Sequence, residues 1–200
     1  MAAVTPTVRL ITGEELAQMP GVGPCELIEG RVVPVSPGGT EQSLVTANAF
    51  RVLHEFVLQA RLGKVLTGVV GFYTRRAPDT VRGADVVYIS AERFERRTRA
   101  LTFLDVAPEL VVEVLSRDDT VIDLTAKLRE YFAADVKIVW VVDPRARRVY
   151  AYRSPVALRE LIESDTLSGE DILPGFAGPA SRARLRGPGF AGPVTAMFQE

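Results

Sequence analysis

Residues 110–115 read Leu-Val-Val-Glu-Val-Leu, an almost wholly apolar run that lies between Pro108 and Ser116. This length and composition are typical of a strand that is covered on both faces of a sheet. A second run of the same character, 137–142, follows it, and a segment with helical spacing of its apolar residues separates the two. The order strand, helix, strand predicts an α/β domain.

Shorter patterns on either side complete the predicted elements. The box Thr12-Gly13-Glu14-Glu15 opens a short helix that Pro20-Gly21 stops. Residues 26–35 have strand character, with a turn at Gly30 and an edge position indicated by Pro34. A helix is expected from 41 to 62, where Gly63 stops it, followed by strands at 64–67, 69–73 and 85–90. A second long helix follows Asp118 and Asp119, and its apolar face consists of Val121, Leu124, Leu128 and Tyr131. The last expected strand, 149–153, forms a hairpin with the run 137–142.

The C-terminal part has a different composition from the rest. We place a single domain at residues 1–176 and a Gly/Pro/Arg-rich tail at 177–200. The sequence Pro-Gly-Phe-Ala-Gly-Pro occurs at 174–179 and again at 188–193, with a basic stretch, 181–186, between the copies. This composition predicts a loop or an arm outside the core. A tandem duplication of surface sequence without function explains it as well.

The composition excludes several classes of chemistry. The 200 residues carry a formal net charge of -1, so nucleic-acid contact needs a local basic face. With Cys25 as the single cysteine and His54 as the single histidine, the chain offers neither a disulfide framework nor a Cys/His zinc site. No apolar run approaches the roughly 20 residues that span a bilayer. We expect a cytoplasmic protein without membrane contact.

Glu113 is the most informative residue of the chain. Alternation along the strand puts it on the face that Val111 and Leu115 share, so its carboxylate lies in or beside a covered sheet and needs a cation, a basic partner or a water-filled cleft. Lys127, on the helix that follows, is placed to reach it, and Asp85 opens the apolar run 86–89 at a strand terminus. These residues predict a metal and acid–base cleft. A structural ion pair accounts for Glu113 with Lys127 equally well, and a turn role accounts for Asp85.

Seven segments, taken together and in this order, resemble the Uma-two (Uma2) family of restriction endonucleases. They are 25–30, 78–87, 108–116, Lys127, Tyr131, 138–144 and 173–176. The similarity covers roughly residues 10–176. It implies membership of the PD-(D/E)XK nuclease superfamily, with a restriction-endonuclease-like mixed sheet flanked by helices.

The resemblance also implies roles for individual residues. Asp85 and Glu113 correspond to metal ligands, and the backbone carbonyl of Val114 corresponds to a third. Leu115 stands where the superfamily pattern has lysine, and Lys127 takes over that role from the next helix. Glu26 matches a recurrent acid that would serve as a catalytic, outer-shell or second-metal residue. Two positions depart from the pattern: Ala84 replaces a proline, and Gln42 replaces a histidine at the start of the long helix.

These residue types indicate a specific reaction and substrate. Carboxylate oxygens favour Mg²⁺ or Mn²⁺ over zinc, which predicts an endonuclease that hydrolyses DNA phosphodiester bonds. The arginines that flank the loop before Asp85 are the expected DNA contacts: Arg75, Arg76 and Arg82. The basic stretch 93–99 is a second cluster, for which a solvated surface is an equal explanation.

Three functions compete for this chain. The first is an active DNase, which we expect to be a homodimer because two sites cut two strands most easily. The second is a catalytically inactive nuclease-fold module that binds nucleic acid or a protein partner. The third is a structural dimerisation domain, which burial of Glu113 and Lys127 without room for an ion would favour.

Overall fold

The computed structural model describes residues 9–176 and 194–199. Its strands are β1 (Cys25–Ile28), β2 (Arg31–Pro34), β3 (Gly63–Arg75), β4 (Thr80–Ser90), β5 (Leu110–Val114), β6 (Ile138–Asp143), β7 (Arg148–Ser154) and β8 (Ala157–Leu161). Its helices are α1 (Gly13–Gln18), α2 (Thr40–Ala60), α3 (Ala91–Arg96), α4 (Val121–Ala133) and the short 3₁₀ helix η1 (Val194–Phe198). Strands and helices therefore alternate as the sequence predicts for an α/β fold.

All eight strands join one mixed sheet, in the order β2-β1-β4-β5-β6-β7-β8, with β3 paired to β4. The pair β5 and β6 is parallel and is connected through α4, which matches the predicted order of strand, helix and strand. The other pairings are antiparallel. The expected mixed sheet with flanking helices is confirmed.

Strand β4 is the strand on which the site is built. On one edge it pairs with β3 over its whole length. On the other edge it pairs with β1 at Val81 and with β5 at residues 86–88. Within the described part of the chain, no strand pairs with this second edge at residues 82–85. The gap leaves backbone N–H and C=O groups that side chains or ligands must satisfy.

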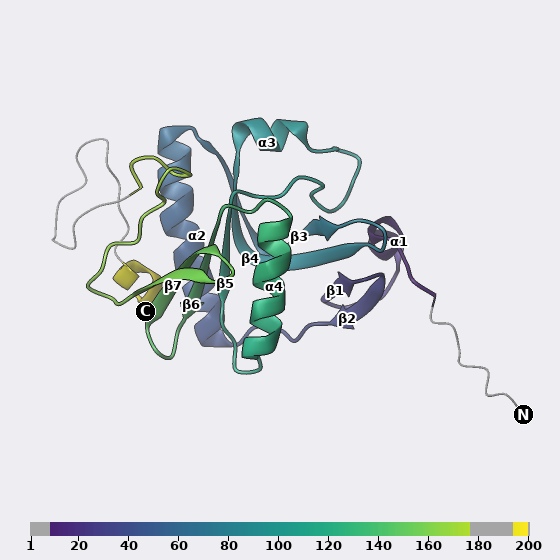
Figure 1. Ribbon diagram of the computed structural model, residues 1–200, viewed down its shortest axis with the longest axis horizontal. Coiled ribbons are helices and arrows are strands. Elements are labelled where there is room, and N and C mark those ends of the chain that lie inside the picture. The colour runs from purple at the N-terminus through teal and green to yellow at the C-terminus, as the bar shows by residue number, and fades with distance from the viewer. Residues whose placement is uncertain (1–8, 177–193, 200) are drawn as a thin grey trace, which may run out of the picture.

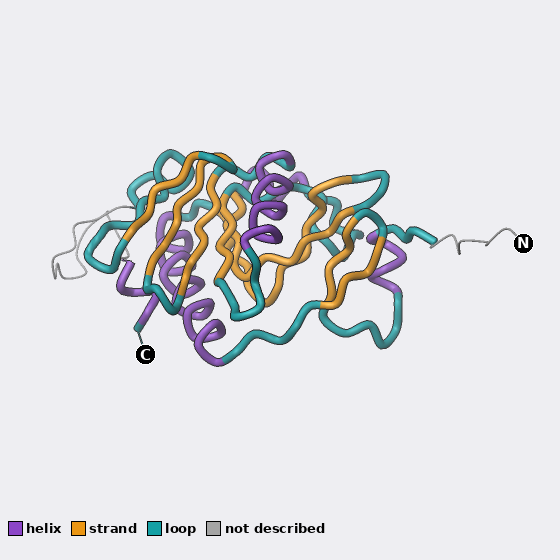
Figure 2. Tube along the Cα trace, turned by 60° about the horizontal axis from the view of Figure 1, so that its bottom comes forward, coloured by secondary structure: helices purple, strands orange, loops and turns teal. Residues whose placement is uncertain are grey.

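Helices α2 and α4 cover opposite faces of the sheet, as Figures 1 and 2 show. Every residue of β5 is buried. Leu110, Val112 and Val114 belong to the cluster that includes α2, whereas Val111 belongs to the cluster that includes α4. The alternation that the sequence predicts for this strand is therefore present, and Glu113 faces α4.

The N-terminal predictions are also confirmed. Thr12 and Glu15 form a capping box at the start of α1. Strands β1 and β2 form a hairpin with Gly30 at a positive φ of 74°, and β2 is the edge strand of the sheet. None of the helices among residues 9–176 and 194–199 is long and apolar enough to cross a membrane.

Several local predictions are wrong. Helix α2 ends earlier than Gly63, because Arg61 adopts the left-handed conformation at its C-terminus. The expected strands 64–67 and 69–73 form one strand, β3, that is interrupted by a bulge at Gly68 and Val69. Val121 is 80% exposed and does not share the buried face of α4, and β8 was not expected.

Asp85 does not open a strand, and Gly83, which falls within the expected loop before Asp85, does not lie in a loop. Both lie inside β4, which begins at Thr80, five residues before Asp85. The pairing with β3 extends β4 across residues 80–84, whose sequence does not show the alternation of a strand. Asp85 therefore lies beside the end of β5, next to Glu113, and not at a strand terminus.

One segment of the expected tail packs on the core. Helix η1 lies within the proposed tail 177–200, yet Val194, Met197 and Phe198 are buried in the cluster that α2 covers. The side chain of Asn48 on α2 donates hydrogen bonds to the carbonyls of Met197 and Gln199. Helix η1 therefore packs on the core. Residues 177–193, which hold the basic stretch and most of the duplication, lie outside the described residues.

Candidate active site

Glu113 is buried at the end of β5, with 8% of its surface exposed. One carboxylate oxygen accepts a hydrogen bond from the Tyr131 hydroxyl on α4, and the other lies 3.2 Å from the Lys127 ammonium. Burial raises the pKa of Glu113 to about 7 despite the attraction of Lys127. The sequence predicts the lysine partner; Tyr131 is one of the positions of the family resemblance, but the sequence predicts no role for its hydroxyl.

Lys127 on α4 contacts residues of three strands, β1, β4 and β5. Its Nζ is 3.2 Å from Glu113, 3.2 Å from Glu26 on β1 and 3.3 Å from the Gly83 carbonyl of β4. Burial opposes its charge, but the two carboxylates outweigh burial and raise the pKa of Lys127 above its usual value. The ammonium therefore stays protonated, and all three of its donor positions are directed at oxygen atoms.

Asp85 lies beside the same strand end. Its Oδ2 accepts a hydrogen bond of 2.7 Å from the backbone N–H of Val114. The β4–β5 register pairs Val86 with Val112, so continuing it by one residue brings Asp85 opposite Glu113. Like charges at opposed positions repel. Burial, the largest cause, raises the pKa of Asp85, and the charge of Asp85 adds to burial in raising the pKa of Glu113.

Arg82 lies in this cluster and not on the surface, where a DNA contact would lie. Its guanidinium is buried, donating to Glu26 at 2.7 Å and to both oxygens of Glu130 on α4, at 2.6 and 2.8 Å. Glu26 also accepts the N–H of Gly83 in the gap of β4. The pKa of Glu26 is lowered, because Lys127 and Arg82 outweigh its burial. The placement argues for a structural role of Arg82 and against a phosphate contact.

The cluster carries an excess of negative charge. Four carboxylates, Glu26, Asp85, Glu113 and Glu130, surround two cations, Lys127 and Arg82, so two negative charges have no counterpart in the cluster when all four carboxylates are ionised. A divalent cation offsets this excess, and the donor atoms are hard oxygens of the kind that Mg²⁺ and Mn²⁺ prefer. The residues therefore fit such an ion in charge and in chemistry.

The acidic side chains alone do not complete a metal site. In the described part of the chain, no three His, Cys, Asp or Glu side chains are grouped so that they could hold an ion. The carbonyl of Val114, implied as a ligand by the resemblance, accepts a hydrogen bond of 2.9 Å from Nε2 of Gln42. Gln42 is therefore a site residue, and its departure from the family's histidine was the sequence signal for it.

The two other predicted DNA contacts lie on the surface. Arg75 and Arg76 at the end of β3 are each 46% exposed. Arg75 pairs with Glu29, while Arg76 pairs with Glu14 and Asp79. Because β3 pairs Arg75 with Thr80, five residues from Asp85 along β4, the backbone of Arg75 is about 16 Å from that of Asp85.

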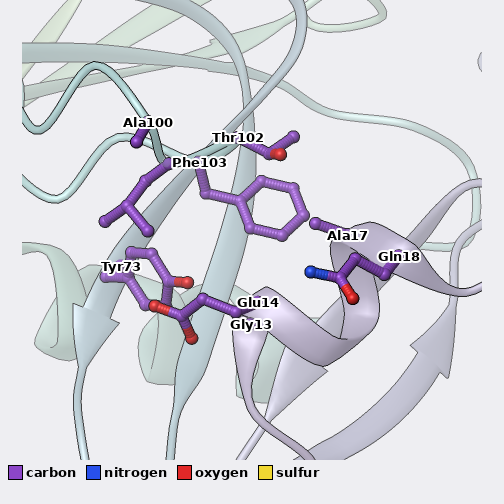
Figure 3. A pocket seen from close by; sticks show the side chains of 9 residues that line it. Gly13, Glu14, Ala17, Gln18, Tyr73, Ala100, Thr102 and Phe103 are labelled. Atoms are coloured by element: carbon purple, nitrogen blue, oxygen red, sulfur yellow. The ribbon is translucent and has the colours of Figure 1, made fainter.

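A small hollow lies close to Arg76 but away from the cluster. It is lined by α1 and by the segment before Leu104, with Tyr73, Glu14 and Phe103 around it (Figure 3). Its volume of about 70 Å³ holds a few water molecules. The hollow has no part in the chemistry that the carboxylates indicate.

A family model and a solved structure that are similar to this chain are both described as nucleases. The model of the Uma2 family, described as "Putative restriction endonuclease", matches residues 14–183. The chain is similar in structure to a crystal structure from Anabaena variabilis ATCC 29413, described as "a putative nuclease belonging to DUF820", with a TM-score of 0.72. The two sequences are 16% identical, and the alignment covers 94% of this chain and 97% of that one, which shows a shared fold. No curated protein matched.

Proposed function

This chain belongs to the Uma2 family, and from that premise we propose that it is a metal-dependent endonuclease that hydrolyses phosphodiester bonds in DNA. The family supports a nuclease in general. The metal dependence and the substrate rest on the convergence of Asp85, Glu113 and Lys127 where β5 ends beside the gap in β4. That convergence is the observation that carries the proposal.

Each residue of the cluster has a defined task in this reaction. Asp85 and Glu113, with the carbonyl of Val114, hold the ion. When bound, Mg²⁺ or Mn²⁺ would act as a Lewis acid that polarises a phosphate oxygen, and it would lower the pKa of a coordinated water molecule. Lys127 stabilises the negative charge that develops on the phosphate, because its ammonium stays protonated between the carboxylates.

The network behind these residues keeps them in position. Tyr131 fixes one oxygen of Glu113, and Glu26 fixes the ammonium of Lys127. Arg82 in turn holds Glu26 and ties it to α4 through Glu130. A reacting group that is held in this way loses little freedom when the substrate binds. Glu26 accordingly acts as a positioning residue in the proposal.

The proposal also includes contacts to DNA outside the cluster and an assembly of two chains. Arg75 and Arg76 are exposed guanidinium groups and are the proposed phosphate contacts outside the cluster. A homodimer remains the proposed assembly for cutting both strands.

The test is cleavage of supercoiled plasmid by the full chain in Mg²⁺ or Mn²⁺, compared with EDTA. We expect nicking by the wild type and its loss in Asp85→Asn and in Glu113→Gln. Glu55→Gln, an exposed carboxylate on α2, is the matched control and should cut normally. Cleavage that survives both site substitutions would refute the assignment.

One observation favours a module that binds without cutting. Both oxygens of Glu113 are engaged by Tyr131 and Lys127. If the wild type binds DNA with an affinity that neither Mn²⁺ nor Glu113→Gln changes, and cuts none, that function replaces the endonuclease.

A further inference from the structure

The amide of Gln42 is only half satisfied. Gln42 lies in the first turn of α2, and its Nε2 donates a hydrogen bond of 2.9 Å to the Val114 carbonyl. Its Oε1 is fully buried and accepts no hydrogen bond from any described residue. A buried acceptor without a donor costs free energy, so such an atom calls for an explanation.

The orientation of the amide is determined by its surroundings. Turning it over in the present state would direct Oε1 at the Val114 carbonyl, and two acceptor oxygens would then face each other. Gly38 makes room for the amide, because a Cβ at that position would lie 2.8 Å from Oε1. The unsatisfied oxygen is therefore built into this state of the site.

The same amide lies against the proposed ion site. In an antiparallel strand the N–H and C=O of one residue point to the same edge. The N–H of Val114 is bonded to Asp85, so its carbonyl, with the Gln42 amide on it, lies on the Asp85 side of β5. Gln42 approaches this point from the α2 face, whereas Lys127 approaches from the α4 face.

We propose that Gln42 is an oxygen ligand of the divalent ion, an inference that rests on the proposed function. Rotation about the Cγ–Cδ bond, a torsion with a broad energy profile, exchanges Nε2 and Oε1. The rotation releases the Val114 carbonyl and turns Oε1 to the same point. Asp85, Glu113, the Val114 carbonyl and Gln42 then supply four oxygens. An amide carbonyl suits Mg²⁺ and Mn²⁺, and it supplies the side-chain donor that the acids alone lack.

The test is calorimetric titration of Mn²⁺ into the metal-stripped full chain, without DNA. We expect Gln42→Leu to weaken Mn²⁺ binding about ten-fold, the lower end of what support of a metal site contributes. Gln42→Glu supplies a charged oxygen at the same place and should tighten binding. Ser43→Asp, which adds the same charge one residue further along α2, is the matched control and should leave binding within about two-fold.

The outcomes separate this inference from the proposed function. If the wild type and Glu113→Gln both fail to bind Mn²⁺, the proposed metal site falls and the inference with it. If the wild type binds and Glu113→Gln does not, but Gln42→Leu binds as well as the wild type, only the role of Gln42 is overturned.

A second readout follows the amide itself. In ¹⁵N spectra we expect the side-chain NH₂ signals of Gln42 to move when Mg²⁺ is added, because Nε2 leaves the Val114 carbonyl. The shift should be absent in Glu113→Gln. Signals that stay constant while Mg²⁺ binds would show that Gln42 is a cap of Val114 and no ligand.

Discussion

Replacing Glu113 by glutamine should stabilise the metal-free protein while it removes the proposed activity. The carboxylate is buried, faces Asp85 and has its pKa raised from 4.5 to about 7 by burial. Glutamine keeps the shape and removes the charge. Lys127 still has Glu26 as a partner in the variant, so no cation is left unpaired.

The size and the pH dependence of this effect follow from the pKa. Each unit between 4.5 and about 7 corresponds to about 1.4 kcal/mol, so ionising Glu113 costs the folded state about 3 kcal/mol. Between these two values the folded state binds more protons than the unfolded state, so wild-type stability falls as pH rises through the window and is then constant. The variant lacks this loss and should unfold about 6 °C higher than the wild type at pH 8.

The assay is thermal unfolding in EDTA at pH 4, 6 and 8, with Glu55→Gln as the exposed control. The wild type and Glu113→Gln should converge at pH 4 and separate at pH 8, and the control should follow the wild type. Adding Mn²⁺ should raise the melting temperature of the wild type and leave that of Glu113→Gln unchanged. A variant that melts below the wild type at pH 8 in EDTA would refute the reasoning.

Other substitutions separate the roles of the neighbouring residues. Lys127→Met should abolish nicking and lower stability by about 3 kcal/mol in a denaturation experiment, since it leaves buried Glu113 without its cation and leaves Glu26 with Arg82 alone. Arg82→Met should also cost about 3 kcal/mol but leave the salt dependence of DNA binding unchanged, because this side chain is buried; a reduced salt slope would restore it as a phosphate contact. Tyr131→Phe should fold with a loss of about 1 kcal/mol and cut more slowly, and equal cutting rates would remove the hydroxyl from the proposal. Phe198→Ala should cost about 3 kcal/mol in urea unfolding, whereas a neutral result would return the C-terminal segment to the status of a tail.

The central strands and the helix between them could be predicted from the sequence, because burial of their side chains requires apolar residues in a recognisable pattern. The apolar runs at β5 and β6 predicted two covered strands, and the helical period of α4 predicted its buried face. The two-residue period of β5 predicted the face of Glu113. Lys127 followed from these periods, because a helix that returns over the strand brings its first turns close to the strand end.

The remaining features depend on pairing between distant segments. Asp85 lies inside β4 because β3 pairs with residues 80–84, and nothing local indicates that pairing. Arg82 has the same residue type as the exposed arginines before it, and only the approach of Glu26 and Glu130 shows that it is buried. The segment at η1 is short and follows a Gly/Pro-rich stretch, so its burial against α2 leaves no periodic signal.

The gap in β4 makes the fold and the site depend on the same atoms. Where β1 and β5 leave this edge of β4, the backbone groups of Gly83 bond to Glu26 and Lys127, and the N–H of Val114 bonds to Asp85. The side chains that close the gap are thus those that carry the proposed chemistry. A substitution such as Asp85→Ala removes a proposed ligand and also leaves the backbone N–H of Val114 without its partner, whereas Asp85→Asn can still accept from Val114 through its side-chain oxygen. Loss of cleavage therefore identifies a ligand only when the isosteric variant, which preserves the strand, loses it too.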